Sequence, residues 1–144
     1  MTKSDSSAEP RKFAGRFPIK VRWSDLDALG HVNNSRFFTF FEQARVEWLE
    51  QTGWGGKAVA GNPVVVTASC HFKKAIGYPE TVEVGLYAGP LGNSSIPTFY
   101  EIRTAAGELA ATGDAVMVWI DARSGRSMPL PEAVRDLLKE LPDA

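Results

Sequence analysis

The sequence predicts an α+β domain in which an antiparallel sheet wraps around one long apolar helix, and three observations lead to this fold class. One segment, between Asn34 and Gly53, carries apolar residues at helical spacing. One alternating strand-like segment precedes it and four strand-like segments follow it, of which two alternate, one is mixed and one is a continuous apolar run. Short turns rich in Gly and Pro separate the later strands, which favours antiparallel neighbours. Because the helix is the only element large enough to cover one face of such a sheet, the sheet is expected to curve around it.

The first part of the chain divides into a tail and a strand. Residues 1–16 are predicted to form a disordered N-terminal tail, because they are polar and rich in charged residues and Ser. The predicted domain spans residues 17–144. Its first strand is expected from the alternation of apolar side chains at Phe17, Ile19 and Val21, continuing to Trp23.

The central helix follows a loop that ends in Asn33 and Asn34, either of which is suited to cap it. Gly53 is a suitable residue to end it. Nearly every side of its first two turns is apolar, so the helix is expected to be deeply buried.

Four strand-like segments come after the helix, at residues 64–72, 81–86, 98–103 and 115–120. With the first strand they give an antiparallel sheet of five or six strands, in which the short connections favour a meander. A short amphipathic C-terminal helix is expected to open at Pro131.

Composition narrows the class of protein. Of the 144 residues, 44% are hydrophobic and 23% charged, values that are typical of one globular domain. No apolar run approaches the roughly 20 residues of a membrane span. A net charge of −1 with scattered Lys and Arg offers no basic surface for nucleic acid. The first 16 residues lack the apolar region of a secretory signal, which favours the cytoplasm, and we interpret the lone Cys70 as a buried structural thiol.

Polar chemistry is concentrated in the loop before the helix, which reads Asp-Leu-Asp-Ala-Leu-Gly-His-Val-Asn-Asn over residues 25–34. A second motif, Phe-Lys-Lys-Ala-Ile-Gly-Tyr-Pro-Glu-Thr, occupies residues 72–81. Together with Phe37 and the Glu-Gln-Ala-Arg run at residues 42–45, these motifs resemble the hot-dog-fold thioesterases of the 4-hydroxybenzoyl-CoA thioesterase type. The resemblance covers about residues 18–121.

The resemblance implies a hot-dog fold and hydrolysis of acyl-CoA thioesters to free acid and CoA. It implies a homodimer or homotetramer with sites between subunits, and no cofactor beyond the CoA of the substrate. It also implies that Asp27 is catalytic and that the N–H at the start of the helix, at about Asn34, polarises the thioester carbonyl. Acyl chain length, aryl or alkyl preference, and CoA or carrier protein are left open.

The residues themselves suit this chemistry, which needs a nucleophile or base, donors for an oxyanion and an apolar pocket. Asp27 can act as a nucleophile that forms an anhydride, or as a general base on water, and both remain open. A base needs a desolvated setting, which we expect from burial beside Trp23 and Leu29. The neighbouring Asp25 is expected to be structural and paired with an Arg.

The start of the helix is the predicted oxyanion site. Gly30 allows a positive φ or close approach of substrate, and the amides of Val32, Asn33 and Asn34 are then expected to point out of the helix N-terminus. His31 is expected either to orient Asp27 or contact substrate, or to be a buried histidine bonded to a backbone carbonyl.

The resemblance also implies an alternative catalytic acid, Glu42, which lies eight to nine residues into the helix, roughly where another hot-dog branch carries its catalytic acid, and is flanked by Phe38 and Phe41. Glu42 could instead form an ion pair with Arg45 or Arg36. Phe37 and Phe41 are predicted to line the acyl pocket.

Lys73 and Lys74 are candidates to meet the phosphates of CoA, or else form a solvated rim. No metal site is expected, because His31 and His71 are the only histidines and no acidic cluster has ligand spacing.

Two other functions suit this architecture. One is a hydratase or dehydratase acting on acyl thioesters, for which His71 lacks the sequence that follows the histidine in those enzymes. The other is a non-catalytic acyl-binding module, which would have no need of the carboxylate of Asp27.

Overall fold

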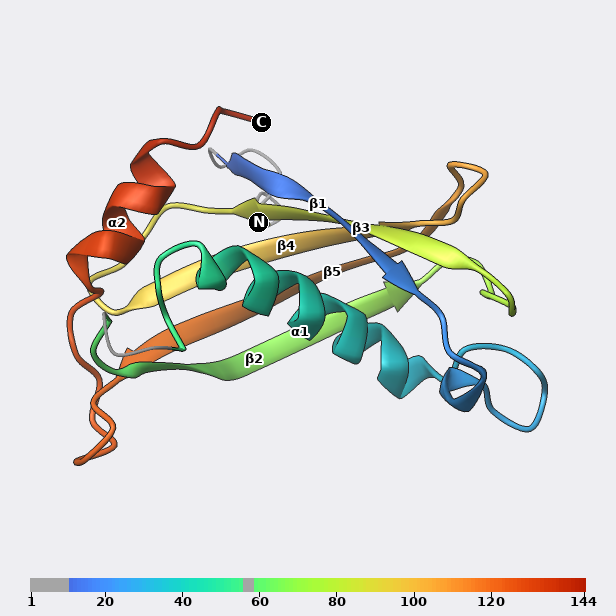
Figure 1. Ribbon diagram of the computed structural model, residues 1–144, viewed down its shortest axis with the longest axis horizontal. Coiled ribbons are helices and arrows are strands. Elements are labelled where there is room, and N and C mark those ends of the chain that lie inside the picture. Colours follow the sequence, from blue (N-terminus) through green and yellow to red (C-terminus); the bar gives the residue numbers. More distant parts are fainter. Residues whose placement is uncertain (1–10, 56–58) are drawn as a thin grey trace, which may run out of the picture.

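The structure is a computed structural model that describes residues 11–55 and 59–144. In chain order its elements are β1 (Lys12–Lys20), the 3₁₀ turn η2 (Trp23–Asp25), α1 (Asn34–Glu50), β2 (Asn62–Phe72), β3 (Thr81–Ala88), β4 (Ser95–Arg103), β5 (Leu109–Ile120) and α2 (Glu132–Lys139). Figure 1 shows α1 lying across one face of the antiparallel sheet, with α2 at one end of the molecule and η2 at the other. The predicted α+β class with one long central helix is confirmed, and the architecture is that of a hot-dog fold.

The strands of the sheet follow the order β1-β3-β4-β5-β2. Only β3, β4 and β5 form the meander that the short turns predicted. The prediction is wrong for β2, which pairs along its length with β5 instead of with the next strand in sequence. Side-chain alternation sets which face a residue occupies, but it does not encode the partner strand.

The predicted tail is too long and the predicted first strand is shifted. β1 begins at Lys12, where Phe13 pairs with Tyr87 and their ring centroids lie 5.4 Å apart. A bulge at Gly15, with φ 143°, interrupts the alternation and hides this part of the strand in the sequence. At its other end β1 stops at Lys20, and Trp23 lies in η2. Residues 1–10 of the predicted tail lie outside the described residues.

The core lies between α1 and the inner face of β3, β4 and β5. The ring of Phe41 on α1 stacks on Tyr100 of β4, with centroids 4.5 Å apart. Gly113 on β5 makes room for it, since a Cβ there would lie 2.5 Å from the Phe41 ring. The other side chains of α1 that the fold buries are Phe37, Phe40, Ala44, Trp48 and Leu49.

The edge strand β2 has few buried side chains on either face, although its sequence alternates like that of a half-buried strand. Val64, Val65, Val66 and Phe72 are all exposed. Cys70 is only half-buried, and burial raises the pKa of its thiol to about 11, so it is protonated at neutral pH. The single chain therefore leaves one apolar edge of its sheet uncovered. No helix in the described part of the chain is long and apolar enough to cross a membrane.

Candidate active site

The loop between β1 and α1 is held closed by its own backbone. Asp27 N–H donates to the carbonyl of His31 at 2.8 Å, and Gly30 N–H donates to the carbonyl of Asp27 at 3.1 Å. Gly30 takes the positive φ, 82°, that this turn requires, as predicted. Leu26 and Val32 bridge the base of the loop in antiparallel fashion. The catalytic candidates are thus fixed on a short, closed turn.

Asp25 anchors the near side of this loop and is completely buried. Its carboxylate accepts hydrogen bonds from the backbone N–H of Arg22 at 2.8 Å and from the Arg22 guanidinium at 3.0 Å, and Arg36 lies 3.7 Å away. Burial acts to raise the pKa of Asp25, but the hydrogen bonds and charges of Arg22 and Arg36 outweigh it and lower the pKa below its usual value. The expectation that Asp25 is structural and paired with an Arg is confirmed.

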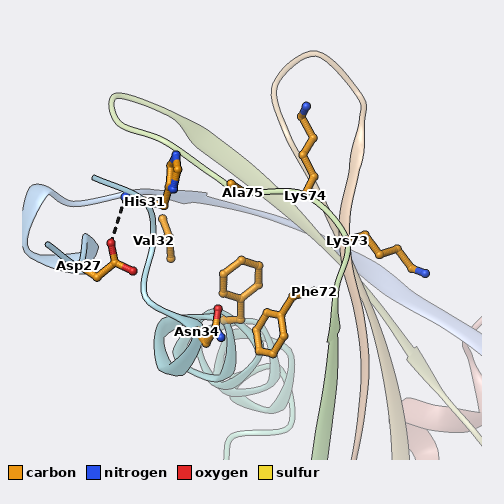
Figure 2. A pocket seen from close by; sticks show the side chains of 9 residues that line it. Asp27, His31, Val32, Asn34, Phe72, Lys73, Lys74 and Ala75 are labelled. Atoms are coloured by element: carbon orange, nitrogen blue, oxygen red, sulfur yellow. Dashed lines mark hydrogen bonds between the residues drawn. The ribbon is translucent and has the colours of Figure 1, made fainter. Parts of the chain in front are cut away.

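Asp27 is exposed, and its carboxylate faces its own turn. The Oδ1 atom accepts hydrogen bonds from the backbone N–H groups of Leu29 at 2.9 Å and His31 at 3.3 Å. Figure 2 shows the second of these bonds. Trp23 and Leu29 are 74% and 83% exposed, so the expected burial of Asp27 beside them is wrong for the single chain.

Only one of the three predicted oxyanion amides remains available. Val32 N–H donates to the carbonyl of Ile76 at 2.8 Å, and Asn33 N–H donates to the carbonyl of Asp25 at 2.9 Å. The prediction that these two amides point freely from the helix is therefore wrong, because they tie the loop to its neighbours. Asn34 is the first residue of α1, and its N–H has no hydrogen-bond acceptor within residues 11–55 and 59–144.

Asn33 is the N-cap of α1. Its Oδ1 atom accepts hydrogen bonds from the N–H and the hydroxyl of Ser35, both at 2.9 Å. This side chain therefore holds the helix start, and the backbone of Asn34 next to it faces outward from the helix end.

A pocket of about 300 Å³ lies at this end of α1 and brings many of the predicted residues together (Figure 2). Its walls are Asp27, His31, Val32, Asn34, Phe37, Phe72, Lys73, Lys74 and Ala75. The rings of Phe37 and Phe72 meet edge to face with centroids 5.0 Å apart, which gives the pocket its apolar side. Phe72 and Ala75 were not predicted as site residues. Their position in the sequence, directly before and after Lys73 and Lys74, could have predicted them.

Other predicted site residues lie elsewhere. Phe41 is in the core against Tyr100, so its predicted place in the acyl pocket is wrong. Neither Gly30 nor Asn33 is among the side chains of the pocket wall, and both shape the loop instead. His31 lines the pocket with an exposed side chain, which excludes the buried-histidine interpretation, and it contacts Asp27 through its backbone.

The two lysines differ in their electrostatic partners. Lys74 Nζ lies 3.5 Å from Glu108, an exposed and therefore weak ion pair. Lys73 has no carboxylate within 4.0 Å in the described part of the chain. In Figure 2 both side chains extend outward from the pocket wall.

Glu42 does not join the Asp27 site. It lines a separate pocket with Phe38, Thr39, Arg45, Val65 and Ala68. The ion pair expected between Glu42 and Arg45 or Arg36 is absent in the described residues: Arg36 approaches Asp25, and Arg45 bonds to the hydroxyl of Tyr100.

Comparison with known proteins agrees with this fold. The family model of the thioesterase-like superfamily matches residues 21–138. The structure of the PA5185 protein of Pseudomonas aeruginosa superposes with a TM-score of 0.83 and 32% identity, covering 94% of this chain and 99% of that one. A thioesterase of Thermus thermophilus, solved with coenzyme A and zinc, has a TM-score of 0.77 and 34% identity over 89% and 94% of the two chains. The long-chain acyl-CoA thioesterase FadM of Escherichia coli is 27% identical over 126 residues, which cover 85% of this chain and 96% of FadM.

The fold and the family match together define a hot-dog thioesterase. The chain belongs to the thioesterase-like superfamily, and it is an enzyme of the acyl-CoA thioesterase class.

Proposed function

We propose that this enzyme hydrolyses acyl-CoA thioesters with Asp27 as the catalytic carboxylate and the N–H of Asn34 as the oxyanion donor. The observation that carries the proposal is that Asp27 and Asn34 line one pocket. The carboxylate is held on its closed turn by two backbone N–H groups, and the unpaired amide lies at the positive end of α1. A thioester carbonyl placed between them meets a base or nucleophile on one side and a donor on the other.

Two sequences of steps fit these groups. As a general base, Asp27 takes a proton from water while the water oxygen attacks the carbonyl carbon, and the tetrahedral intermediate then expels CoA thiolate. As a nucleophile, the carboxylate oxygen attacks the carbonyl carbon directly, CoA thiolate leaves, and water cleaves the resulting anhydride. In both, negative charge develops on the carbonyl oxygen, which the N–H of Asn34 stabilises.

The rest of the pocket suits the two ends of the substrate. The facing rings of Phe37 and Phe72 offer an apolar surface to the acyl group. Lys73, which has no carboxylate partner in the described residues, is the better placed of the two lysines to meet a CoA phosphate.

A second copy of the chain completes the site in this proposal. β2 is an edge strand with exposed valines, and Phe72 at its end belongs to the pocket. Pairing of β2 with β2 of another subunit would cover these side chains and extend the hydrogen-bonded sheet. It would also remove water from around Asp27, which the loop of the single chain does not do.

Thiol release from a panel of short, medium, long and aryl CoA thioesters tests the proposal. We expect wild type to turn over at least one class, and Asp27→Asn to lower kcat about a hundredfold or more, or about 2.7 kcal/mol of barrier. Glu42→Gln, which also exchanges an exposed carboxylate for an amide, tests the alternative acid in α1 and is assayed at a protein concentration at which it has the same oligomeric state as wild type. If Glu42→Gln is the inactive variant and Asp27→Asn is not, the catalytic acid lies in α1 and the Asp27 assignment is wrong.

The phosphate contact has its own test. KM for the best CoA thioester should rise with ionic strength in wild type, and this dependence should vanish in the double variant Lys73→Ala, Lys74→Ala. Unchanged kinetics in the double variant would remove the lysines from the site. Assay of the same acyl group on a carrier protein shows whether CoA is the preferred carrier.

A further inference from the structure

The pocket around Glu42 lies in the middle of the uncovered side of the molecule. It has a volume of about 310 Å³, and its walls come from α1 (Phe38, Thr39, Glu42, Arg45) and β2 (Val65, Ala68). Glu42 is the central residue of α1, and Val65 and Ala68 flank Thr67 at the centre of β2. The pocket is therefore at the centre of the surface that the proposed homodimer would bury.

The guanidinium of Arg45 is held by a chain of buried hydroxyl groups. Thr98 donates its hydroxyl proton to the carbonyl of Ala115 at 2.8 Å, so it accepts from the hydroxyl of Tyr100, 2.7 Å away. The Tyr100 oxygen in turn accepts from Arg45 Nη1 at 3.2 Å. Because Thr98 and Tyr100 are both buried, their hydroxyl groups hold the Arg45 guanidinium in one position.

Glu42 and Arg45 both lack an ion-pair partner within 4.0 Å in the described part of the chain. Residues three apart on a helix are often close enough to pair, but here Arg45 turns toward Tyr100 instead. The two opposite charges share their pocket with the apolar side chains of Phe38, Val65 and Ala68. This patch carries one unpaired anion and one unpaired cation, so it is complementary to a second copy of itself.

Twofold symmetry can bring the anion of one patch against the cation of the other. In a twofold interface the same patch lies on both subunits, so a contact from one residue to another is repeated in reverse. Antiparallel pairing of two β2 strands about their centres places the two pockets against each other. We propose that Glu42 of each subunit forms an ion pair with Arg45 of the partner subunit, and that these two pairs set the register of the homodimer.

This inference rests on the homodimer of the proposed function. It assigns the residues that determine how the two subunits align. An ion pair covered by a second subunit gains little over an apolar contact, because both charges lose water. Its larger effect is to exclude other registers, in which two like charges would face each other or one charge would be buried alone.

Charge-reversed variants test the pairing by native mass spectrometry and sedimentation, with no substrate present. Arg45→Glu and Glu42→Arg should each raise the dimer dissociation constant about a hundredfold or more, because like charges then face each other. An equimolar mixture of the two variants should give a one-to-one heterodimer, since every Glu then faces an Arg. The double variant Glu42→Arg, Arg45→Glu should likewise form a homodimer.

These designs separate charge pairing from damage to the fold. The double variant loses the Arg45 contact with Tyr100 just as Arg45→Glu does, so recovery of the dimer cannot come from that contact. If Arg45→Glu fails to fold, Glu42→Arg must still lose the dimer by itself, and Glu42→Gln must weaken it less.

The pairing is overturned if folded single variants dimerise like wild type, or if their mixture yields no heterodimer. A monomeric wild type overturns it together with the proposed homodimer. The role of Asp27 is measured separately, by thiol release.

Discussion

Asp25 and Asp27 stand two residues apart in one loop, and the fold gives them opposite environments. Asp25 is completely buried and bonded to Arg22, whereas Asp27 is exposed and bonded to the backbone of its own turn. The 3₁₀ turn that ends at Asp25 causes the difference, because it directs that side chain back under Arg22. The carboxylate of Asp25 thus holds the loop together, and the carboxylate of Asp27 is the exposed one, at the pocket of the proposed reaction.

The backbone links the two roles. The carbonyl of Asp25 accepts the N–H of Asn33, and this bond positions the first turn of α1. Asp27 and Asn34, the residue that follows Asn33, line the same pocket. We therefore expect changes at Asp25 to lower the stability of the fold, and changes at Asp27 or Asn34 to lower the rate of hydrolysis.

The largest effect is expected from Asn34→Pro, which removes the proposed oxyanion donor on the Asp27 side. Proline is well tolerated at the first position of a helix, where the missing N–H has no partner within the helix. Asn33 already has the extended backbone that a following proline requires, with φ −62° and ψ 140°. We expect kcat to fall about 10² to 10³-fold while the helix is retained.

Asn34→Ala is the control, because it keeps the backbone N–H and removes only the side chain. Its kcat should stay within a few fold of wild type, and circular dichroism should show equal helix content in both variants. If Asn34→Ala is as slow as Asn34→Pro, the side-chain amide and not the backbone is the active group.

The next largest effect is expected in the stability of Asp25→Ala. The change removes a buried acceptor of two charge-assisted hydrogen bonds from Arg22 and leaves Arg36 without its neighbour. We expect the free energy of unfolding to fall by about 3 kcal/mol, measured by urea denaturation. Asp27→Ala should lower it by less than about 1 kcal/mol, since its exposed bonds compete with water. Equal losses would mean that both carboxylates hold the loop.

The sequence was sufficient to predict the helix and most strands, since these depend on the spacing of apolar side chains. It was also sufficient to place Asp27, His31, Val32, Asn34 and Phe37 in one pocket, because they are close in the chain. Spacing could not reveal that β2 pairs with β5, or that the Gly15 bulge extends β1 back to Lys12. Strand partners and bulges are set by contacts between distant segments.

The prediction about the oxyanion amides fails for the same reason, because the hydrogen-bond partner of a single N–H can also lie far away in the sequence. Val32 and Asn34 look equivalent in the sequence, as two amides near a helix start. Their difference comes from Ile76, more than forty residues away, whose carbonyl accepts the N–H of Val32. No local pattern carries that information.

The pH dependence of stability offers a smaller effect that separates the two aspartates again. The pKa of folded Asp25 lies below its ordinary value of 3.8. Its ionised form therefore stabilises the fold fully above the pKa of the unfolded chain, and this contribution is lost as the pH falls through the folded pKa. The difference in unfolding free energy between wild type and Asp25→Asn should be constant near neutral pH and shrink below about pH 4.

Asp27→Asn serves as the comparison at neutral pH, where its difference in unfolding free energy from wild type should be small, because Asp27 is exposed. A difference for Asp25→Asn that is independent of pH down to about pH 3 would mean that the charge of Asp25 adds nothing to its hydrogen bonds.

The smallest effect is expected from Asn33→Ala. Asn33 caps α1 with its side chain and bonds to the Asp25 carbonyl with its backbone N–H. This change removes the cap of α1 and should lower the free energy of unfolding by about 1 kcal/mol. The backbone bond from Asn33 to Asp25 survives the change and keeps the Asn34 amide in place, so kcat should fall less than tenfold, or about 1.4 kcal/mol.

Ser35→Ala is the matched control for Asn33→Ala, since it removes one hydrogen bond to the same Oδ1 atom but leaves the cap. Its stability should stay within about 0.5 kcal/mol of wild type. A loss of kcat in Asn33→Ala as large as that of Asn34→Pro would show that helix capping, and not Asp25, positions the oxyanion donor. The division between a structural and a reactive half of the loop would then be wrong.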